Sequence, residues 1–316
     1  MPVAHNRNDA SSESFHAGFL KPGYWGTWSL LVVLWLVMWL PRKWVMAIGG
    51  CYGDQMRKRN SKRRKIAETN LRLCFPELDD DQRQAMLKDH FRCYGQGLMD
   101  MGLAMMGTKN RIGKFTSVQG MENLSGLPGT QKTILITYHT TTLDMFPMSF
   151  MTGIDLVSMM KRDHNPVLNW FLYRSRMRHR KVKVYMRDQG LRRILDGMNE
   201  GRACFLVPDE DLGAGKHTVF APFFGQDRST LNTVGRLARI TDAVVIPGIC
   251  RLIPETGCYV TTLLPPLDDF PTGDQVRDAS IMSEAMEKLI HQAPEQYLWT
   301  FRWFQTRPAG MESPYD

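Results

Sequence analysis

The stretch TILITYHTTTLDM (133–145) runs from apolar and β-branched residues directly into a histidine, three threonines and an aspartate. Its first part, 133–139, is typical of a buried strand, and 141–151 is typical of a helix that Pro147 kinks or shortens. Open α/β sheets bind their ligands beyond the carboxyl ends of strands. The stretch therefore predicts a strand, a site and a helix in succession, with His139 at the site.

Strands and helices continue to alternate through the rest of the chain. Further strands are predicted over 154–160, 181–186, 202–207, 243–249 and 258–264. Helices are predicted within 66–106 and over 165–178, 190–200, 230–240 and 274–292. Because such alternation covers both faces of a parallel sheet with helices, the predicted fold class is α/β, with a mostly parallel sheet flanked by helices.

His139 and Asp144 form a candidate catalytic pair. On one continuous helix, residues five apart point about 140° away from each other. The two side chains meet only if His139 lies in the loop and Asp144 in the first helical turn. An aspartate at one imidazole nitrogen fixes the tautomer and leaves the other nitrogen to accept a proton from a hydroxyl group. The alternative is an ordinary hydrogen-bonded histidine at a strand end, with Asp144 closing a capping box with Thr141.

The composition is that of a globular, basic protein. Hydrophobic residues make up 43% of the 316, charged residues 23%, and the formal net charge is +8. Such a charge favours acidic partners, namely anionic lipid, nucleic acid or an acidic carrier protein. No RNA-binding motif with interleaved aromatic residues supports nucleic acid. The six cysteines lack C-x-x-C spacing, which argues against a metal site and suits reduced thiols.

An uncharged apolar run occupies residues 22–41. As a helix it would span roughly 30 Å, the thickness of a bilayer core, and tryptophans lie near its ends. Arg42, Lys43 and the basic run 57–65 follow it, which predicts a cytoplasmic C-terminal side and attraction to anionic lipid headgroups. The alternatives are a buried core helix and a helix that lies in the membrane interface.

The H-x-x-x-x-D box made by His139 and Asp144 stands among segments that resemble one bacterial enzyme family. These segments are NLRLCFPEL (70–78), VPDEDLG (207–213), VFAPFFG (219–225) and TVGRLARITDAVVIPGI (233–249). Over residues 20–307 the chain resembles the late, secondary acyltransferases of lipid A biosynthesis, the lauroyl and myristoyl acyltransferases. Many members of that family carry glutamate where this chain has Asp144.

The resemblance implies a glycerolipid-acyltransferase-like enzyme anchored in the bacterial inner membrane by one N-terminal helix, with its catalytic domain on the cytoplasmic face. It implies transfer of a fatty acyl chain from an acyl-carrier-protein thioester to a hydroxyacyl chain of a lipid A precursor, in lipopolysaccharide or lipooligosaccharide biosynthesis, without a cofactor. A thioester needs no covalent activation, so His139 as general base, with Asp144 stabilising the imidazolium, suffices together with oxyanion stabilisation. The absence of a G-x-S-x-G motif agrees with direct transfer.

Seven further residues are candidates for substrate binding: Arg162, Arg174, Arg176, Asp209, Asp211, Phe223 and Phe224. By resemblance, the first arginine binds phosphate or polarises the donor. The other two belong to a basic run, 174–181, suited to lipid A phosphates or to the acidic carrier. The aspartates lack histidines at ligand spacing, so they are expected to hydrogen-bond the acceptor or backbone groups rather than a metal. The phenylalanines either line an acyl tunnel or belong to the core.

Two other functions are compatible with these features. An acyl-CoA-dependent lysophospholipid acyltransferase uses the same box, although the segments 207–213 and 219–225 argue against it. A non-enzymatic, membrane-tethered protein would bind anionic lipid through 57–65 and 174–181. Such binding would be sensitive to salt and independent of His139.

These features divide the chain into five parts. They are an N-terminal tail (1–21), a membrane anchor (22–44), a basic helical region (45–130), an acyltransferase α/β core (131–307) and a C-terminal tail (308–316).

Overall fold

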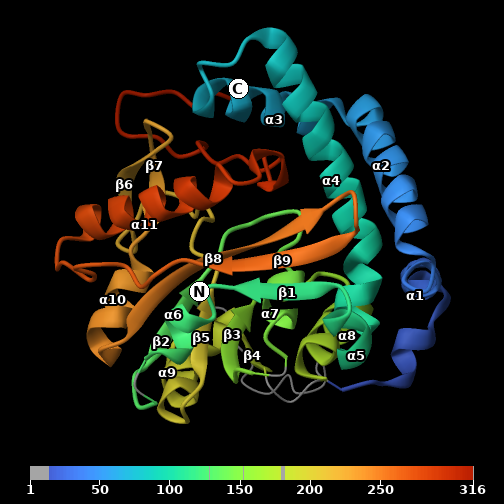
Figure 1. Ribbon diagram of the computed structural model, residues 1–316, viewed down its shortest axis with the longest axis horizontal. Helices are drawn as coiled ribbons and strands as arrows, with labels where there is room; N and C mark the ends of the chain where they lie inside the picture. The colour runs from blue at the N-terminus through green and yellow to red at the C-terminus, as the bar shows by residue number, and fades with distance from the viewer. Residues whose placement is uncertain (1–13, 128, 152, 179–181, 316) are drawn as a thin grey trace, which may run out of the picture.

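The structure is a computed structural model of the chain, and it describes residues 14–127, 129–151, 153–178 and 182–315. Seven strands within these residues form a central sheet in the order β1-β9-β8-β2-β5-β3-β4 (Figure 1). Neighbouring strands run parallel except β8 and β9, which form an antiparallel pair. The strands are β1 (Thr116–Gln119), β2 (Thr133–Ile136), β3 (Leu156–Met160), β4 (Val182–Met186), β5 (Ala203–Leu206), β8 (Val244–Ile253) and β9 (Cys258–Leu263).

Helices cover both faces of this sheet, which confirms the predicted fold class. Ile134 and Ile136 of β2 point into one apolar cluster, and Leu135 points into the other, as successive residues of a strand must. The first cluster includes side chains of α9 (Arg192–Asn199), α10 (Thr233–Thr241) and α11 (Gln275–Ile290). The second includes those of α7 (Met145–Met148) and α8 (Pro166–Met177).

Two long helices, α2 and α4, run side by side along one edge of the molecule (Figure 1). Glycines bring them close together, since a Cβ on Gly53 would lie 2.0 Å from the carbonyl oxygen of Phe91. Both helices belong to the region that precedes β2, which also holds β1. This region contains η2 (Ala17–Leu20), η3 (Pro22–Tyr24), α1 (Trp25–Val37), α2 (Arg42–Arg59), α3 (Ser61–Cys74), α4 (Asp80–Met106), α5 (Lys109–Gly113) and α6 (Glu122–Ser125).

The apolar run 22–41 was expected to form one membrane-spanning helix. Its α-helix, α1, instead has 13 residues and ends at Val37, because Pro41 has no backbone N–H to bond to the carbonyl oxygen of Val37 and its ring would clash with that oxygen in a continued helix. Within the described residues, none of the helices combines the length and the apolarity needed to cross a bilayer.

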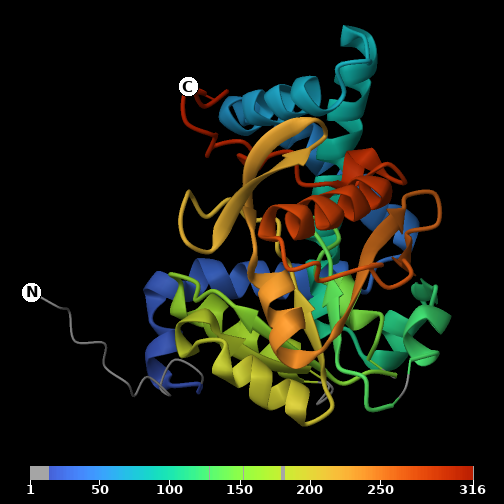
Figure 2. The same ribbon diagram turned by 90° about the vertical axis from the view of Figure 1, so that its left-hand side faces the viewer.

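Two further departures from the predicted elements lie near the site. The helix predicted over 141–151 is reduced to α7, with turns on either side. An unpredicted antiparallel hairpin, β6 (Thr218–Phe223) and β7 (Gln226–Leu231), stands apart from the main sheet and packs on α11 (Figure 2). After α11 the chain has η5 (Pro294–Gln296) and then an aromatic segment, and η4 (Arg187–Gln189) follows β4.

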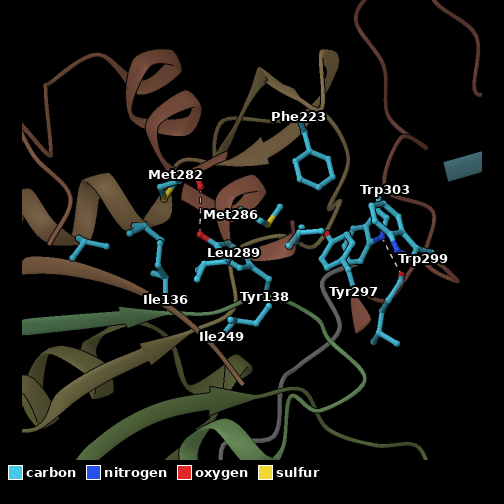
Figure 3. Packing of buried hydrophobic residues seen from close by; sticks show 14 of the residues in the cluster. Ile136, Tyr138, Phe223, Ile249, Met282, Met286, Leu289, Tyr297, Trp299 and Trp303 are labelled. Atoms are coloured by element: carbon cyan, nitrogen blue, oxygen red, sulfur yellow. Dashed lines mark hydrogen bonds between the residues drawn. The ribbon is translucent and has the colours of Figure 1, made fainter. Parts of the chain in front are cut away.

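The aromatic segment after η5 lies against the hairpin and the end of β2 (Figure 3). Tyr297, Trp299 and Trp303 are fully buried there. Tyr138, which directly precedes His139, is buried in the same cluster and donates a hydrogen bond to the carbonyl oxygen of Met282 in α11 (3.3 Å). Rigid packing on one side therefore fixes the backbone that presents His139.

Candidate active site

Two neighbouring strands bring His139 and Asp209 together. Strands β2 and β5 are parallel, with Ile136 opposite Leu206, and each of the two site residues follows its strand by three positions. The Nδ1 atom of His139 lies 2.6 Å from Oδ1 of Asp209, and the backbone nitrogen of His139 donates to Oδ2 at 2.8 Å. One carboxylate thus fixes both the ring and the backbone of the histidine.

Asp144 was expected at the imidazole, and the structure corrects this expectation. In the described residues, Nδ1 of His139 is bound by Asp209, whereas Oδ1 of Asp144 accepts a hydrogen bond from Nη2 of Arg176 (2.9 Å). The register of the parallel strands places the end of β5 beside His139, while Asp144 begins α7 on the other side of the turn. The alternative capping box is not formed either, because Oγ1 of Thr141 has no hydrogen-bond partner among the described residues and Asp144 makes no side-chain cap.

Asp209 belongs to a buried polar network that the sequence did not predict. Tyr297 donates its hydroxyl to Oδ2 of Asp209 (3.1 Å). Arg228 of β7 is 2% exposed, and its guanidinium lies 3.9 Å from the ring centre of Phe223. Burial opposes the charge of Asp209, but His139 and, more weakly, Arg228 outweigh it and hold the pKa of Asp209 below its usual value.

The same carboxylate governs the charge of His139. Burial disfavours the imidazolium, but Asp209 more than compensates, and the pKa of His139 is raised above its usual value. The rings of Phe301 and Trp303 lie 5.4 and 6.0 Å from the imidazole, centre to centre. With Nδ1 facing a carboxylate, the proton belongs on Nδ1, and Nε2 is the acceptor. This arrangement suits a general base.

His139 opens onto a cavity of about 950 Å³, which is within the usual size range of ligand sites. Asp144 and the candidate arginines Arg162 and Arg176 also line it. Nε of Arg162 donates to Asp188 at 2.9 Å, and Arg176 is paired with Asp144. Arg174 is exposed on α8 and lies outside the cavity wall formed by the described residues. The structure therefore places two of the three predicted arginines in the site.

The three remaining candidates for substrate binding have structural roles. They are Asp211, Phe223 and Phe224. The carboxylate of Asp211 accepts hydrogen bonds from the backbone nitrogens of Gly213 (3.0 Å) and Thr306 (2.7 Å), which is one of the two expected uses. Phe223 is fully buried (Figure 3), with the guanidinium of Arg228 over its ring. Phe224 packs against Trp299 and other aromatic rings. In the described structure neither phenylalanine lines the cavity, so the core interpretation holds for both.

A further ion pair borders the cavity. Nη1 of Arg187 donates to Oε2 of Glu210 at 2.7 Å, and both residues contribute to the cavity wall. Glu210 raises and Arg187 lowers the pKa of His139, each less than Asp209 does. Within the described residues, no cluster of three histidine, cysteine or acidic side chains could hold a metal ion.

Comparison with known proteins finds relatives that match almost the whole chain. The family model for bacterial lipid A biosynthesis acyltransferases matches residues 12–306. The lipid A biosynthesis lauroyltransferase of Escherichia coli K12 is 32% identical over 303 residues, which are 95% of this chain and 98% of that protein. The palmitoleoyltransferase of the same strain is 31% identical with the same coverage. The myristoyltransferase of that strain is 26% identical over 320 residues, 100% of this chain and 97% of that protein.

Proposed function

The chain belongs to the bacterial lipid A biosynthesis acyltransferase family, and on that premise we propose that it moves a fatty acyl chain from an acyl-carrier-protein thioester to a hydroxyacyl chain of a lipid A precursor. Membership makes the chain an O-acyltransferase of lipid A biosynthesis. The donor, the position of the acceptor hydroxyl and the roles of individual residues belong to the proposal. The observation that supports this proposal is the hydrogen bond between His139 and buried Asp209 at the wall of a largely apolar cavity.

In the proposed reaction, His139 acts as the general base. Its Nε2 takes the proton of the acceptor hydroxyl as the oxygen attacks the thioester carbonyl carbon. The tetrahedral intermediate then expels the carrier's thiolate, which receives the proton back from the imidazolium. The new ester and a free thiol are the products, so atoms and charges balance. Asp209 keeps the proton of the neutral ring on Nδ1 and stabilises the imidazolium between the two steps.

Asp144 has a different place in this proposal. It pairs with Arg176 in the cavity wall, and Arg162 lies in the same wall. Arginines that face a cavity suit phosphate groups, because the guanidinium can donate two parallel hydrogen bonds. We therefore assign the arginines to phosphates of the lipid A precursor or of the carrier's prosthetic group, and Asp144 to holding Arg176 in position.

The proposed partners and location follow from charge and exposure. A net charge of +8 favours an acidic carrier protein, because opposite charges accelerate encounter. Leu30, Val33 and Leu36 of α1 are exposed apolar residues, which suits contact with lipid tails. The exposed cations of the run 57–65 suit anionic headgroups. We place the catalytic domain at the cytoplasmic face of a bacterial inner membrane.

The decisive experiment replaces the base. His139→Ala is expected to lower the rate of acyl transfer by about 10²–10⁴, the usual contribution of a general base. The assay offers acyl-carrier-protein thioester with a lipid A precursor, and in parallel acyl-CoA with a lysophospholipid, to separate the two acyltransferase hypotheses. His291→Ala, at an exposed histidine outside the cavity wall, is the matched control. A folded His139→Ala variant with nearly the wild-type rate would refute the mechanism.

A further inference from the structure

The cavity beside His139 extends over both faces of the sheet. Successive residues of a strand point to opposite faces. The last three residues of β3 (158–160) line the cavity, and so do the last two residues of β5 and the residue that follows it (205–207). Met160 and Phe205 belong to the apolar cluster under α7 and α8, while Met159 and Leu206 pack on the opposite cluster. The cavity therefore wraps around the carboxyl edge of the sheet.

The part on the side of α7 and α8 lies against the apolar cluster under those helices, and we name it the inner arm. Its wall includes Met148, Met160, Val182, Val184 and Phe205, all of them buried. The two valines are two residues apart on β4, so they face the same side of the sheet. Strand β4 is an edge strand of the sheet. An apolar chain that enters from His139 would lie along this wall with little contact with water.

The part on the side of α9 and α10 is open, and we name it the outer arm. Val234 and Leu237 of α10 line its interior and are buried. Three large aliphatic side chains at its mouth are strongly exposed: Leu191 (41%), Leu212 (55%) and Ile240 (70%). Exposed aliphatic residues grouped around a cavity mouth mark a surface that meets apolar ligands.

We propose that the two arms hold two different acyl chains in the same turnover, the donor's chain in the inner arm and the acceptor's hydroxyacyl chain in the outer arm. This rests on the proposed function, in which both substrates carry acyl chains that must meet at His139. The donor has one chain, which the buried apolar side chains of the inner arm can cover. The acceptor is a lipid with several chains, so one must enter while the others remain outside against an apolar rim.

Matched substitutions in the two arms test this assignment. Val184→Phe narrows the inner arm, so the preferred donor is expected to become shorter, with at least a tenfold change in the ratio of 10-carbon to 14-carbon transfer. The KM for the lipid A precursor should stay unchanged. Leu237→Phe narrows the outer arm, so it should raise that KM at least tenfold and leave the donor ratio unchanged. Because overpacking can disturb folding, Val184→Leu serves as a milder variant in the inner arm, and the fold of both phenylalanine variants is checked by circular dichroism.

A binding measurement separates this inference from the proposed function. Native mass spectrometry with dodecanoic acid should find two molecules bound per wild-type chain at saturation, and one in each phenylalanine variant. Two bound molecules in a protein that transfers no acyl chain would refute the proposed function and leave the two arms standing. Transfer with a single bound molecule, or a donor ratio that shifts equally in both variants, would overturn the two-arm assignment and leave the function standing.

Discussion

At the scale of single residues, Asp209 is held by three hydrogen bonds. The backbone nitrogen of His139, Nδ1 of the same residue and the hydroxyl of Tyr297 all contact its two oxygens. A carboxylate bound in this way cannot rotate, so the imidazole it holds is equally fixed. Buried Arg228 supplies a positive charge that favours the ionised form of Asp209. This geometry supports the proposed role of His139 as a general base.

The roles of the two aspartates predict different pH profiles. A base works when neutral, so the rate should rise with pH through the pKa of His139, which is raised mainly by Asp209 against the effect of burial. Asp209→Asn removes this charge, so the rise should move to lower pH, while the maximal rate falls by about 10²–10⁴ because the ring loses its orienting partner. Asp144→Asn should leave the rise at the wild-type pH and act on KM through Arg176.

These profiles are measured as kcat against pH from 5 to 9, with the fold of each variant checked by circular dichroism. If Asp144→Asn shifted the rise and Asp209→Asn did not, Asp144 would be the partner of His139 during catalysis. Asp209 would then not be the residue that raises the pKa of His139 during catalysis.

His139 could be predicted from sequence, and its partner could not. The histidine follows an apolar run, which is a local signal. Its contact with Asp209 depends on β2 and β5 being neighbours, and the order of strands is decided by packing between distant segments. Asp209 was a candidate because it follows a predicted strand, yet Asp144 was closer in the chain. The sequence did not identify Arg228 as a buried residue of the site, because a charged residue in a hairpin usually faces solvent.

At the scale of elements, Arg42 joins α2 to α4 and to the β8–β9 turn. The sequence suggested a basic residue at a membrane surface, but its guanidinium donates to both oxygens of Asp100 (2.5 and 2.6 Å) and to the carbonyl oxygen of Gly257. The hydroxyl of Tyr259 donates to the same carboxylate. The side chains of Arg42 and Asp100 are 12% and 1% exposed. This buried pair ties the N-terminal helices to the sheet.

Breaking this pair should cost stability. Arg42→Met leaves the charge of Asp100 buried without its partner, so the free energy of unfolding should fall by about 3–5 kcal/mol. Arg64→Met removes a pair with Glu68 that is about one-third exposed, and its cost should be about 1 kcal/mol or less. Urea unfolding followed by circular dichroism measures both. Equal losses in the two variants would contradict the structural role of Arg42, and the double variant Arg42→Met/Asp100→Leu should recover part of the loss.

Most core strands and helices could be predicted because their apolar patterns are local. The β6–β7 hairpin could not, since its turn is formed by Phe224 and Gly225, both at positive φ. Two-residue hairpin turns of this kind usually carry Asn-Gly or Asp-Gly. Phenylalanine is tolerated here because its ring packs against Phe75 and Trp299, so a tertiary contact compensates for an unfavourable backbone.

At the scale of the whole molecule, α1 is apolar on all sides but buried on only one. Leu31, Leu34 and Met38 form its buried stripe. A helix that is apolar all round normally has its other faces covered as well. Its neighbour α8 contributes to the cavity wall, and the two helices are joined by a hydrogen bond from Asn165 to Thr27 (2.7 Å). A membrane in contact with α1 would therefore lie close to the cavity.

If the protein meets the membrane through α1, as we propose, substitutions on the exposed face of this helix should weaken its binding to lipid vesicles. Val33→Glu/Leu36→Glu places charges on the exposed face of α1, and losing the burial of two such side chains should cost about 3 kcal/mol or more, roughly 100-fold in partitioning. Co-sedimentation with vesicles of phosphatidylethanolamine and phosphatidylglycerol measures this loss. Val276→Glu, at an exposed valine of α11, is the control and should bind like wild type.

Salt separates the apolar and the electrostatic parts of this binding. Raising the salt concentration screens the basic run 57–65 and should weaken the binding of wild type and of the α1 variant by a similar factor. The residual binding of wild type at 1 M salt should disappear in Val33→Glu/Leu36→Glu, because only the apolar face of α1 holds the protein there. Residual binding that survives these substitutions would mean that α1 is not the surface that meets the lipid. The acceptor would then have to reach the outer arm from a bilayer that contacts another face of the molecule.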